Sequence, residues 1–349
     1  MHMADALISP AVGGTMWIVT AGLMAGCARK VKQTRDDRLV PMMGVLGAFI
    51  FTAQMINFSI PATGSSGHLG GGLILTILLG PNAAFLVIAS VLTIQSLFFA
   101  DGGLLALGCN IFNLGFFPSF IAYPLFYKLI AGEVRVGTRA WLAAMVAGII
   151  GLQLGAFGVV LETKMSGISE LPFKTFVLIM QPIHLAIGIV EGLTTAAVVA
   201  FIARARPEAL AIGTVSETLP QGRSLRPVLI GLLVAAAFLG GAASWFASTH
   251  PDGLEWSITK ITGKEEFVGA NDGLHEEMTA VQAKTAFLPD YEFKAVPEKN
   301  TSAKSAAPPP APWPAIKTGK SLSGIVGGIL TLALAILIGF ALKTHTKVA

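Results

Sequence analysis

Long apolar runs constrain the fold of this chain more than any other feature. A helix needs about 20 apolar residues to cross the hydrocarbon core of a bilayer, and runs near this length recur along the whole chain. Charged residues make up only 13% of the composition, against roughly 25% in soluble domains. We therefore predict an all-α, polytopic membrane protein embedded in the lipid bilayer of the cell membrane. The predicted spans are residues 11–28, 39–57, 69–79, 81–99, 104–127, 140–161, 173–203, 227–247 and 322–342.

Basic residues between the runs predict the orientation of the chain. Four basic groups follow the first, fifth, seventh and ninth runs, and short loops rich in lysine and arginine stay in the cytoplasm. Nine crossings then place the amino terminus outside and the carboxyl terminus in the cytoplasm. The basic residues are Arg29, Lys30, Lys32, Arg35 and Arg38, then Lys128, Arg135 and Arg139, then Arg204, Arg206, Arg223 and Arg226, then Lys343 and Lys347. These charges are scattered and do not form one face, so a nucleic-acid partner is not expected.

Loop composition divides the chain into two parts. Residues 1–203 are a predicted seven-span bundle, in which the third run is too short for a full span and Gly80-Pro81 separates it from the fourth. We expect that run to be a short helix buried in the bundle. Residues 204–226 are a predicted cytoplasmic linker, and residues 227–349 are a two-span unit around a polar outer loop at about 248–320. The end of that loop is rich in proline and predicts an extended spacer.

The chain begins MHMAD, which puts a histidine next to the α-amino group. Histidine at position 2 is too large for removal of the initiator methionine, so we expect a free Met1 amine. The Met1 nitrogen, the His2 amide nitrogen and His2 Nδ1 can close two fused chelate rings in one plane. Ni(II) and Cu(II) prefer such tetragonal nitrogen sites, whereas Zn(II) prefers a tetrahedron. The alternative is that His2 is an ordinary polar residue at a solvated terminus.

His68 is the candidate for the fourth in-plane donor. It follows a turn-rich loop on the predicted outer side, where several glycines permit close backbone approach. A histidine at a helix start is often a hydrogen-bonded structural residue, but histidine is also the commonest metal ligand. Two histidines on one side of the membrane, one of them next to a free amine, favour a metal site.

Several motifs of the first part occur together: Gly67-His68-Leu69, Leu79-Gly80-Pro81, Ala100-Asp101-Gly102-Gly103 and Asn110-Ile111-Phe112-Asn113. With the opening MHMADALISP, they resemble the CbiM/NikM family, the substrate-binding (S) components of nickel and cobalt energy-coupling-factor (ECF) transporters. The second part, whose loop opens FASTHPDGLEWSI, resembles the small CbiN/NikN partner of these transporters, here fused to the first part. The resemblance implies a seven-helix S-component bundle followed by two further transmembrane helices.

The resemblance implies that the transported substrate is a square-planar Ni(II) ion held by the Met1 amine, the His2 amide and imidazole, and the His68 imidazole. The alternative is Co(II), in a cobalt-specific component that feeds cobalamin synthesis. It also implies separate partners: a transmembrane coupling subunit like CbiQ/NikQ and cytoplasmic ATPase subunits like CbiO/NikO. The chain itself would then be neither an enzyme nor an ATP-binding protein. TGKS at 318–321 agrees with this, because a phosphate loop needs glycine where Pro314 stands.

Two other functions fit the residues less well. A secondary permease for metal ions would need intramembrane clusters such as HxxxxDH, which the sequence lacks. An intramembrane metal-dependent hydrolase would need HExxH on a span. The His275-Glu276 step has Thr279 in place of the second histidine and lies in the predicted outer loop.

Other polar residues are candidates to support the site. Asp5 could offset the charge of the ion, with helix capping as an equal alternative. Asn110 and Asn113 share a helix face, from which they either support the site or bond neighbouring helices. We expect Asp101 to cap a helix or form a turn, and His184 and Glu191 in the seventh span to be a structural pair. These last three residues are not predicted to bind the ion.

Overall fold

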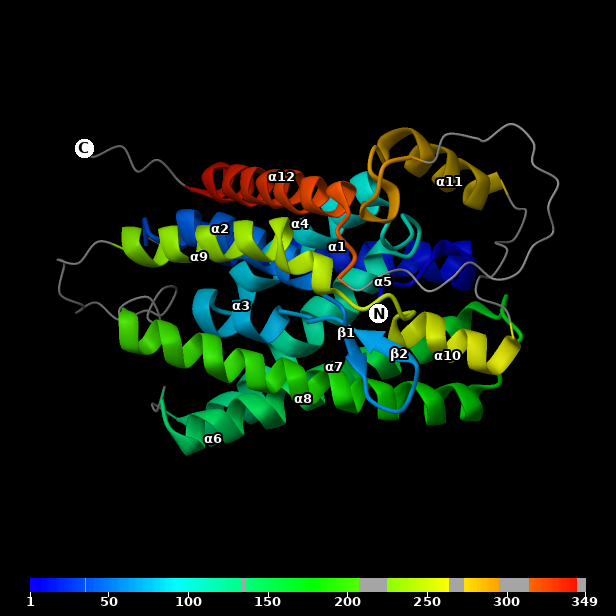
Figure 1. Cartoon of the computed structure of the whole chain (residues 1–349), viewed down its shortest axis with the longest axis horizontal. Coiled ribbons are helices and arrows are strands. Elements are labelled where there is room, and N and C mark those ends of the chain that lie inside the picture. Colours follow the sequence, from blue (N-terminus) through cyan, green and yellow to red (C-terminus); the bar gives the residue numbers. More distant parts are fainter. Residues whose placement is uncertain (35, 133–135, 207–224, 264–272, 295–313, 344–349) are drawn as a thin grey trace.

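Helices make up most of the computed structural model (Figure 1), which describes residues 1–34, 36–132, 136–206, 225–263, 273–294 and 314–343. Residues 207–224 of the predicted linker and most of the proline-rich spacer lie outside these residues. The elements in chain order are η1 (Asp5–Leu7), α1 (Pro10–Lys32), α2 (Leu39–Gln54), β1 (Phe58–Ile60), β2 (Ser65–Gly67), α3 (Gly72–Leu79), α4 (Pro81–Phe99), α5 (Leu107–Ile111), η2 (Phe112–Tyr127), α6 (Lys128–Ala131), α7 (Thr138–Ser166), α8 (Phe173–Ala205), α9 (Arg226–Gly241), η4 (Ala243–Phe246), α10 (Gly253–Thr262), α11 (Gly273–Thr285), η5 (Pro289–Tyr291) and α12 (Thr318–Leu342).

Six helices within the described residues are long and apolar enough to cross a membrane: α1, α4, the continuous stretch Leu107–Ala131, α7, α8 and α12. The apolar helices α2 and α9 have 16 residues each, which is about 24 Å of helix against a hydrocarbon core of about 30 Å. The prediction of a helical, multi-pass membrane protein is therefore confirmed. All nine predicted runs contain helix, but the helices α2, α3 and α9 are shorter than a full span.

The short third helix is as predicted. All eight residues of α3 are buried. Gly80 ends α3 with a φ of 77°, a conformation that glycine adopts without strain, and Pro81 is the first residue of α4. The two helices are thus separated by a sharp turn inside the bundle.

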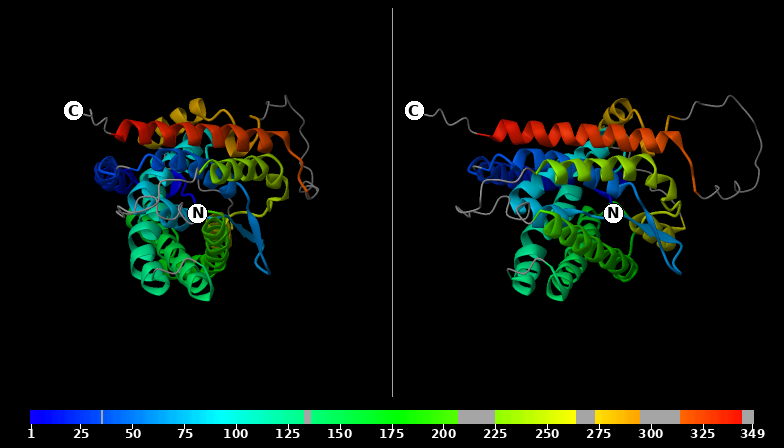
Figure 2. Two further views of the ribbon diagram at one scale, coloured as in Figure 1. Left: turned by 90° about the vertical axis from the view of Figure 1, so that its left-hand side faces the viewer. Right: turned by 60° about the vertical axis from the view of Figure 1, so that its left-hand side comes forward.

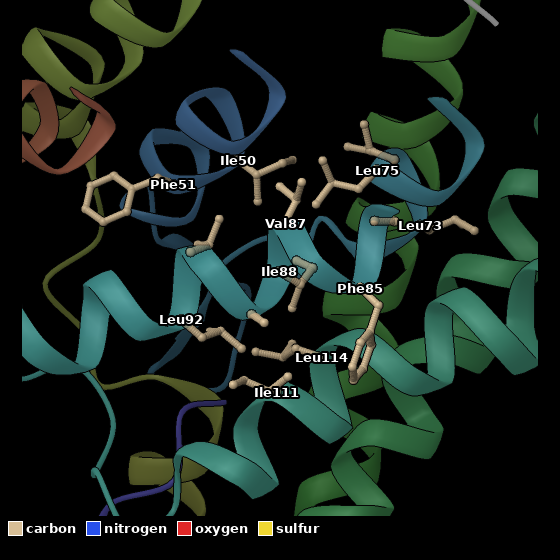
Figure 3. Close-up of a cluster of buried hydrophobic side chains, with 14 of the residues drawn as sticks. Ile50, Phe51, Leu73, Leu75, Phe85, Val87, Ile88, Leu92, Ile111 and Leu114 are labelled. Carbon is tan, nitrogen blue, oxygen red and sulfur yellow. The ribbon is translucent and has the colours of Figure 1, made fainter. Parts of the chain in front are cut away.

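Helix α4 lies at the centre of the first part. It packs against α1, α2, α3 and η2, and also against α12 of the second part. Figure 3 shows Val87 of α4 near Ile50 of α2, and the ring of Phe85 on the same helix near Leu114 of η2. A helix that is apolar on all sides is stable only when neighbours surround it or lipid does, and here the neighbours surround it.

Close helix contacts depend on glycine. A Cβ at Gly148 of α7 would lie 2.8 Å from the backbone nitrogen of Gly192 of α8, so these two helices touch backbone to backbone. A Cβ at Gly327 of α12 would lie 2.0 Å from the ring of Phe51 of α2. Small residues let membrane helices approach closely, and α12 consequently packs along α2 and α9 (Figure 2). The second part is therefore packed against the first.

Some local structure was not predicted. The turn-rich loop before His68 contains a small antiparallel hairpin, β1–β2, in which Phe58 pairs with Gly67. The stretch η2 is a π-helix with Pro118 and Pro124 inside it, and prolines disturb the usual hydrogen bonds of an α-helix. The described part of the predicted outer loop also contains α10 and α11.

Candidate metal site

The amino terminus lies inside the molecule, between the hairpin, α5 and α10 (Figure 1). Met1 is 6% exposed and Met3 is fully buried. Asn110 of α5 fixes Met3: its Oδ1 accepts from the Met3 N–H at 2.8 Å, and its Nδ2 donates to the Met3 carbonyl at 3.1 Å. The Gly103 N–H donates to the same carbonyl at 2.9 Å. The Met1 amine therefore has a defined position.

The Met1 amine lies next to His68, although 67 residues separate them in the chain. Met1 N is 3.2 Å from His68 Nε2, and the ring centroids of His2 and His68 are 4.9 Å apart. Adjacent donors of a square-planar site are separated by about 2.9 Å when the metal–nitrogen bonds have a usual length of about 2.0–2.1 Å. The Met1–His2 chelate would leave one corner open, between the amine and the His2 imidazole. His68 lies beside both of these groups.

His68 presents a neutral nitrogen to the amine. Its Nδ1 lies 2.9 Å from the Leu69 carbonyl, so Nδ1 carries the hydrogen and Nε2 keeps its lone pair. Burial lowers the pKa of His68 to about 3, and the positive Met1 amine and the His2 ring act in the same direction. A proton therefore does not compete for Nε2 at neutral pH, which is a requirement for ligation.

Two carboxylates hold the other donors. Asp252 Oδ2 accepts from the Met1 ammonium at 2.6 Å, and Asp101 Oδ1 lies 2.6 Å from His2 Nδ1. Burial raises the pKa of both aspartates, but the charge of Met1 on Asp252 and that of His2 on Asp101 outweigh it, so both pKa values lie below the usual range. Binding of an ion by these donors would require the amine to leave Asp252 and the His2 ring to turn away from Asp101.

Asp101 does more than form a turn, because its carboxylate contacts two distant residues. It follows α4 as predicted, but its carboxylate bonds to His2 on one oxygen and accepts from the Tyr291 hydroxyl on the other. Tyr291 belongs to η5 of the second part. This contact could not be predicted, because the residues around Asp101 and those around Tyr291 contain no pattern that links the two.

Sequence analysis also missed Asp252 as a partner of Met1. Asp252 Oδ1 caps α10 by accepting from the N–H groups of Leu254 and Glu255, at 2.8 and 2.9 Å. The Ser66 N–H of β2 donates to the Pro251 carbonyl at 2.8 Å, which places this cap beside the His68 loop. The D-x-x-E pattern of a capping box signals a helix start. It does not reveal that the other carboxylate oxygen faces residue 1.

Asp5 and Asn113 do not contact the donor nitrogens in any hydrogen bond of the described residues. Asp5 Oδ1 accepts from the Ala106 N–H at 2.9 Å, so it fastens the N-terminal segment to the loop before α5. That approach needs glycine at 103, where a Cβ would lie 1.8 Å from Asp5 Oδ1. Asn113 Nδ2 donates to Glu162 of α7 at 2.7 Å, which is the interhelical alternative. Of the two asparagines, only Asn110 bonds to the N-terminal segment.

His184 and Glu191 do not form the expected pair. The Glu191 carboxylate accepts from the backbone N–H groups of Gly70 and Gly71, at 2.9 and 3.0 Å, and so holds the loop that follows His68. His184 Nδ1 lies 2.8 Å from the Met180 carbonyl. Both residues belong to α8, but each has a separate backbone partner.

Within the described part of the chain, no group of three or more His, Cys, Asp or Glu side chains gathers closely enough to hold a metal ion. The candidate donor set is instead the mixed set of amine, amide and imidazole nitrogens at the amino terminus.

Each of the two parts of the chain matches a known protein family. Residues 2–209 match the family model described as "Cobalt uptake substrate-specific transmembrane region" (CbiM), and residues 226–344 match the PDGLE domain. A crystal structure titled as a truncated transition metal transporter is 29% identical, covers 59% of this chain and 99% of its own, and has a TM-score of 0.52.

Three relatives illustrate the range of names among similar proteins. "Putative fused nickel transport protein NikMN" of Archaeoglobus fulgidus is 31% identical over the whole of both chains. "Fused nickel transport protein NikMN" of Rhodobacter capsulatus is 28% identical over 78% of this chain and 81% of its own. "Cobalt transport protein CbiM" of Geobacter sulfurreducens is 30% identical over 76% of this chain and 78% of its own. The chain belongs to the CbiM family of metal transport proteins, in the fused form that also carries a PDGLE domain.

Proposed function

We propose that this nickel or cobalt transport component is the substrate-capture subunit of an ECF-type transporter, and that it takes Ni(II), or Co(II), from the outer side. One observation carries the proposal: the single α-amino group of the chain is buried 3.2 Å from His68 Nε2, with His2 beside it. The planar nitrogen donors favour Ni(II) by geometry. The printed names of the relatives, which include nickel and cobalt transport proteins, support the same class of substrate.

The energy for transport comes from other subunits in this proposal. A coupling subunit like CbiQ/NikQ and ATPase subunits like CbiO/NikO would drive the captured ion inward. The TGKS sequence at 318–321 supports this division, because a phosphate loop needs glycine where Pro314 stands. The amino terminus lies outside and the carboxyl terminus in the cytoplasm, as the basic loops predict.

The second part acts on the captured ion in this proposal. Its support is the position of Asp252, whose carboxylate holds the Met1 ammonium at 2.6 Å. The second part would thus control how the amine becomes available to the ion. Deletion of residues 227–349 should lower nickel uptake by cells that also express the other subunits. Undiminished uptake would remove this role and leave the capture site itself untouched.

The test of the capture site compares bound nickel and nickel uptake in five chains. They are the native chain, His2→Ala, His68→Ala, a chain with one residue added before Met1, and His250→Ala as a control on an exposed histidine. The extension is the sharpest change, because it keeps every side chain and displaces only the free amine. We expect the first three variants to lose stoichiometric nickel and the control to keep it. Native binding and uptake by the extended chain would overturn the proposal.

A further inference from the structure

His184 is a buried imidazole with one nitrogen still open. Its side chain is 1% exposed, and Nδ1 lies 2.8 Å from the Met180 carbonyl. Nε2 is buried and has no hydrogen-bond partner among the described residues. Buried polar atoms nearly always have a partner, so one without a protein partner is a candidate contact for a water molecule or an ion. A hydrogen bond from Nδ1–H to a backbone carbonyl also fixes the tautomer in which Nε2 carries the lone pair, as in many metal-binding histidines.

His184 lines a small cavity that three of the residues around the Met1 amine also line. Met1, His68, His184 and Asp252 share its wall with Gly67 and Gly253, and its volume is about 10 Å³. That is close to the space needed for one water molecule. The two glycines keep the cavity open beside α8: a Cβ at Gly253 would lie 3.2 Å from His184 Cε1, and a Cβ at Gly67 would lie 2.4 Å from Ile187.

The other polar groups of this cavity are already bonded. Asp252 Oδ2 accepts from the Met1 ammonium, and Oδ1 caps α10. His68 Nδ1 is bonded to Leu69, and its Nε2 faces the Met1 amine. His184 Nε2 is therefore the lining donor that is left for an additional bond.

A flat set of four nitrogens leaves positions above and below its plane. Ni(II) in a strong planar field is low-spin and favours only four donors, because the orbital that points along the axis is filled. Co(II) has one electron fewer, so that orbital is half filled and can accept one axial donor. An imidazole above the plane would therefore stabilise Co(II) more than Ni(II).

We propose that Nε2 of His184 is a fifth, axial donor to the ion held by Met1, His2 and His68, and that it allows the site to take Co(II) as well as Ni(II). This inference rests on the proposed four-nitrogen plane. It adds a residue from the seventh span of the first part to a site otherwise built from the amino terminus and the His68 loop.

Electron paramagnetic resonance of the Co(II) protein tests the axial bond directly. The full-length chain in detergent would receive one equivalent of Co(II) without oxygen. In low-spin Co(II), the unpaired electron points along the axis, so one axial nitrogen-14 splits each cobalt line into three. We expect each cobalt line to be split into three in the native chain and in the control His250→Gln. In His184→Gln we expect no such splitting. Glutamine is close to histidine in length and polarity but has no imidazole nitrogen.

Isotope labelling repeats the test without any substitution. When the protein is produced with nitrogen-15 histidine, each cobalt line should be split into two instead of three, because nitrogen-15 has two spin states. An unchanged triplet in His184→Gln, or an unsplit spectrum in the native chain, would overturn the axial assignment.

Binding measurements separate this inference from the function on which it rests. In His184→Gln we expect the affinity for Co(II) to fall by about tenfold or more, in the range for loss of a supporting metal contact, and the affinity for Ni(II) to change less than about threefold. Retained Ni(II) binding also shows that the variant is folded. An equal change for both ions refutes the axial role alone. If the native chain and the chain extended before Met1 bind Ni(II) equally, the proposed function itself fails.

Discussion

At the scale of single residues, the Met1 amine joins three distant parts of the chain. It lies 2.6 Å from Asp252 and 3.2 Å from His68, and Asn110 holds the backbone two residues further on. An amino terminus usually frays because it lacks tertiary bonds. Here side chains from α5, from the start of α10 and from the hairpin loop bind the N-terminal segment and fix its position.

Replacing Asn110 should release the amino terminus. Asn110→Ala removes both hydrogen bonds to Met3 and leaves a buried N–H and carbonyl with fewer partners, at a cost of about 1–3 kcal/mol. We expect faster chemical labelling of the Met1 amine and at least about tenfold weaker nickel binding. Asn113→Ala is the matched control, since its amide bonds to Glu162. Unchanged labelling in Asn110→Ala would show that other contacts hold the terminus.

Acid should weaken the folded chain through His68. Its pKa is about 3 in the folded chain and about 6.5 when solvated. Between these values the unfolded chain binds a proton that the folded chain does not, so stability rises with pH across this window and falls on acidification. The charged groups that act on the ring are the Met1 ammonium, His2 and Asp252. We expect the unfolding temperature in detergent to fall from pH 7 to pH 5, and to fall less in His68→Gln. Equal falls would contradict this.

At the scale of elements, the His68 loop is held between the hairpin and helix α8. Glu191 of α8 accepts from two backbone N–H groups of the loop, and Gln54 of α2 donates to the Gly70 carbonyl at 2.8 Å. Strand β2 enters the loop with Gly67 against Ile187. The position of His68 therefore depends on backbone contacts with two membrane helices.

A methyl group at position 67 should displace His68. In Gly67→Ala the new Cβ would lie 2.4 Å from Ile187 Cγ1, an overlap that costs about 1–3 kcal/mol in packed interiors. We expect about tenfold weaker nickel binding, measured by titration. The double variant Gly67→Ala/Ile187→Ala should recover most of the affinity, because it restores the space. Gly14→Ala is the control, since no atom lies within 4 Å of that Cβ position. Native affinity in Gly67→Ala would refute the expectation.

At the scale of the whole molecule, the second part is packed on the first along two faces. Helix α12 lies against α2 and α4, and α10 lies against α8 (Figure 1). The α12 contact is close because Gly44 and Gly327 leave room for Ile336 and Phe51 across the interface. Asp252 reaches Met1 through this packing, so a residue of the second part contacts the candidate donor residues of the first.

The two parts should remain associated when the chain is divided. We expect residues 1–206 and 225–349, expressed together as separate chains, to purify as a complex, because close packing of small residues stabilises helix contacts in membranes. Gly327→Leu should reduce recovery by about tenfold, since its Cβ position overlaps Phe51. Gly231→Leu is the control, with no atom within 4 Å. If one of the two pieces of the otherwise native chain were purified without the other, the linker alone would join the two parts.

Local chemistry explains which features were predictable. The short buried α3 followed from the short, mostly apolar run at residues 73–79 between two glycines, with Pro81 at the next helix start. The candidate donors Met1 and His2 followed from covalent neighbours. Asp252 and Tyr291 were not found as partners of Met1 and Asp101, because their contacts span 251 and 190 residues and carry no local pattern. The shortness of α2 and α9 was also missed, since apolar composition continues beyond the last helical turn.

The sequence alone determined that this is a helical membrane chain and predicted a chelating amino terminus, because hydropathy and ring size are properties of neighbouring residues. Only the tertiary structure decided that the terminus is buried, that His68 lies beside the amine, and that carboxylates from α10 and from the end of α4 hold the donors. These contacts depend on how the helices pack. Packing is set by many weak contacts between residues far apart in the chain, none of which a local pattern records.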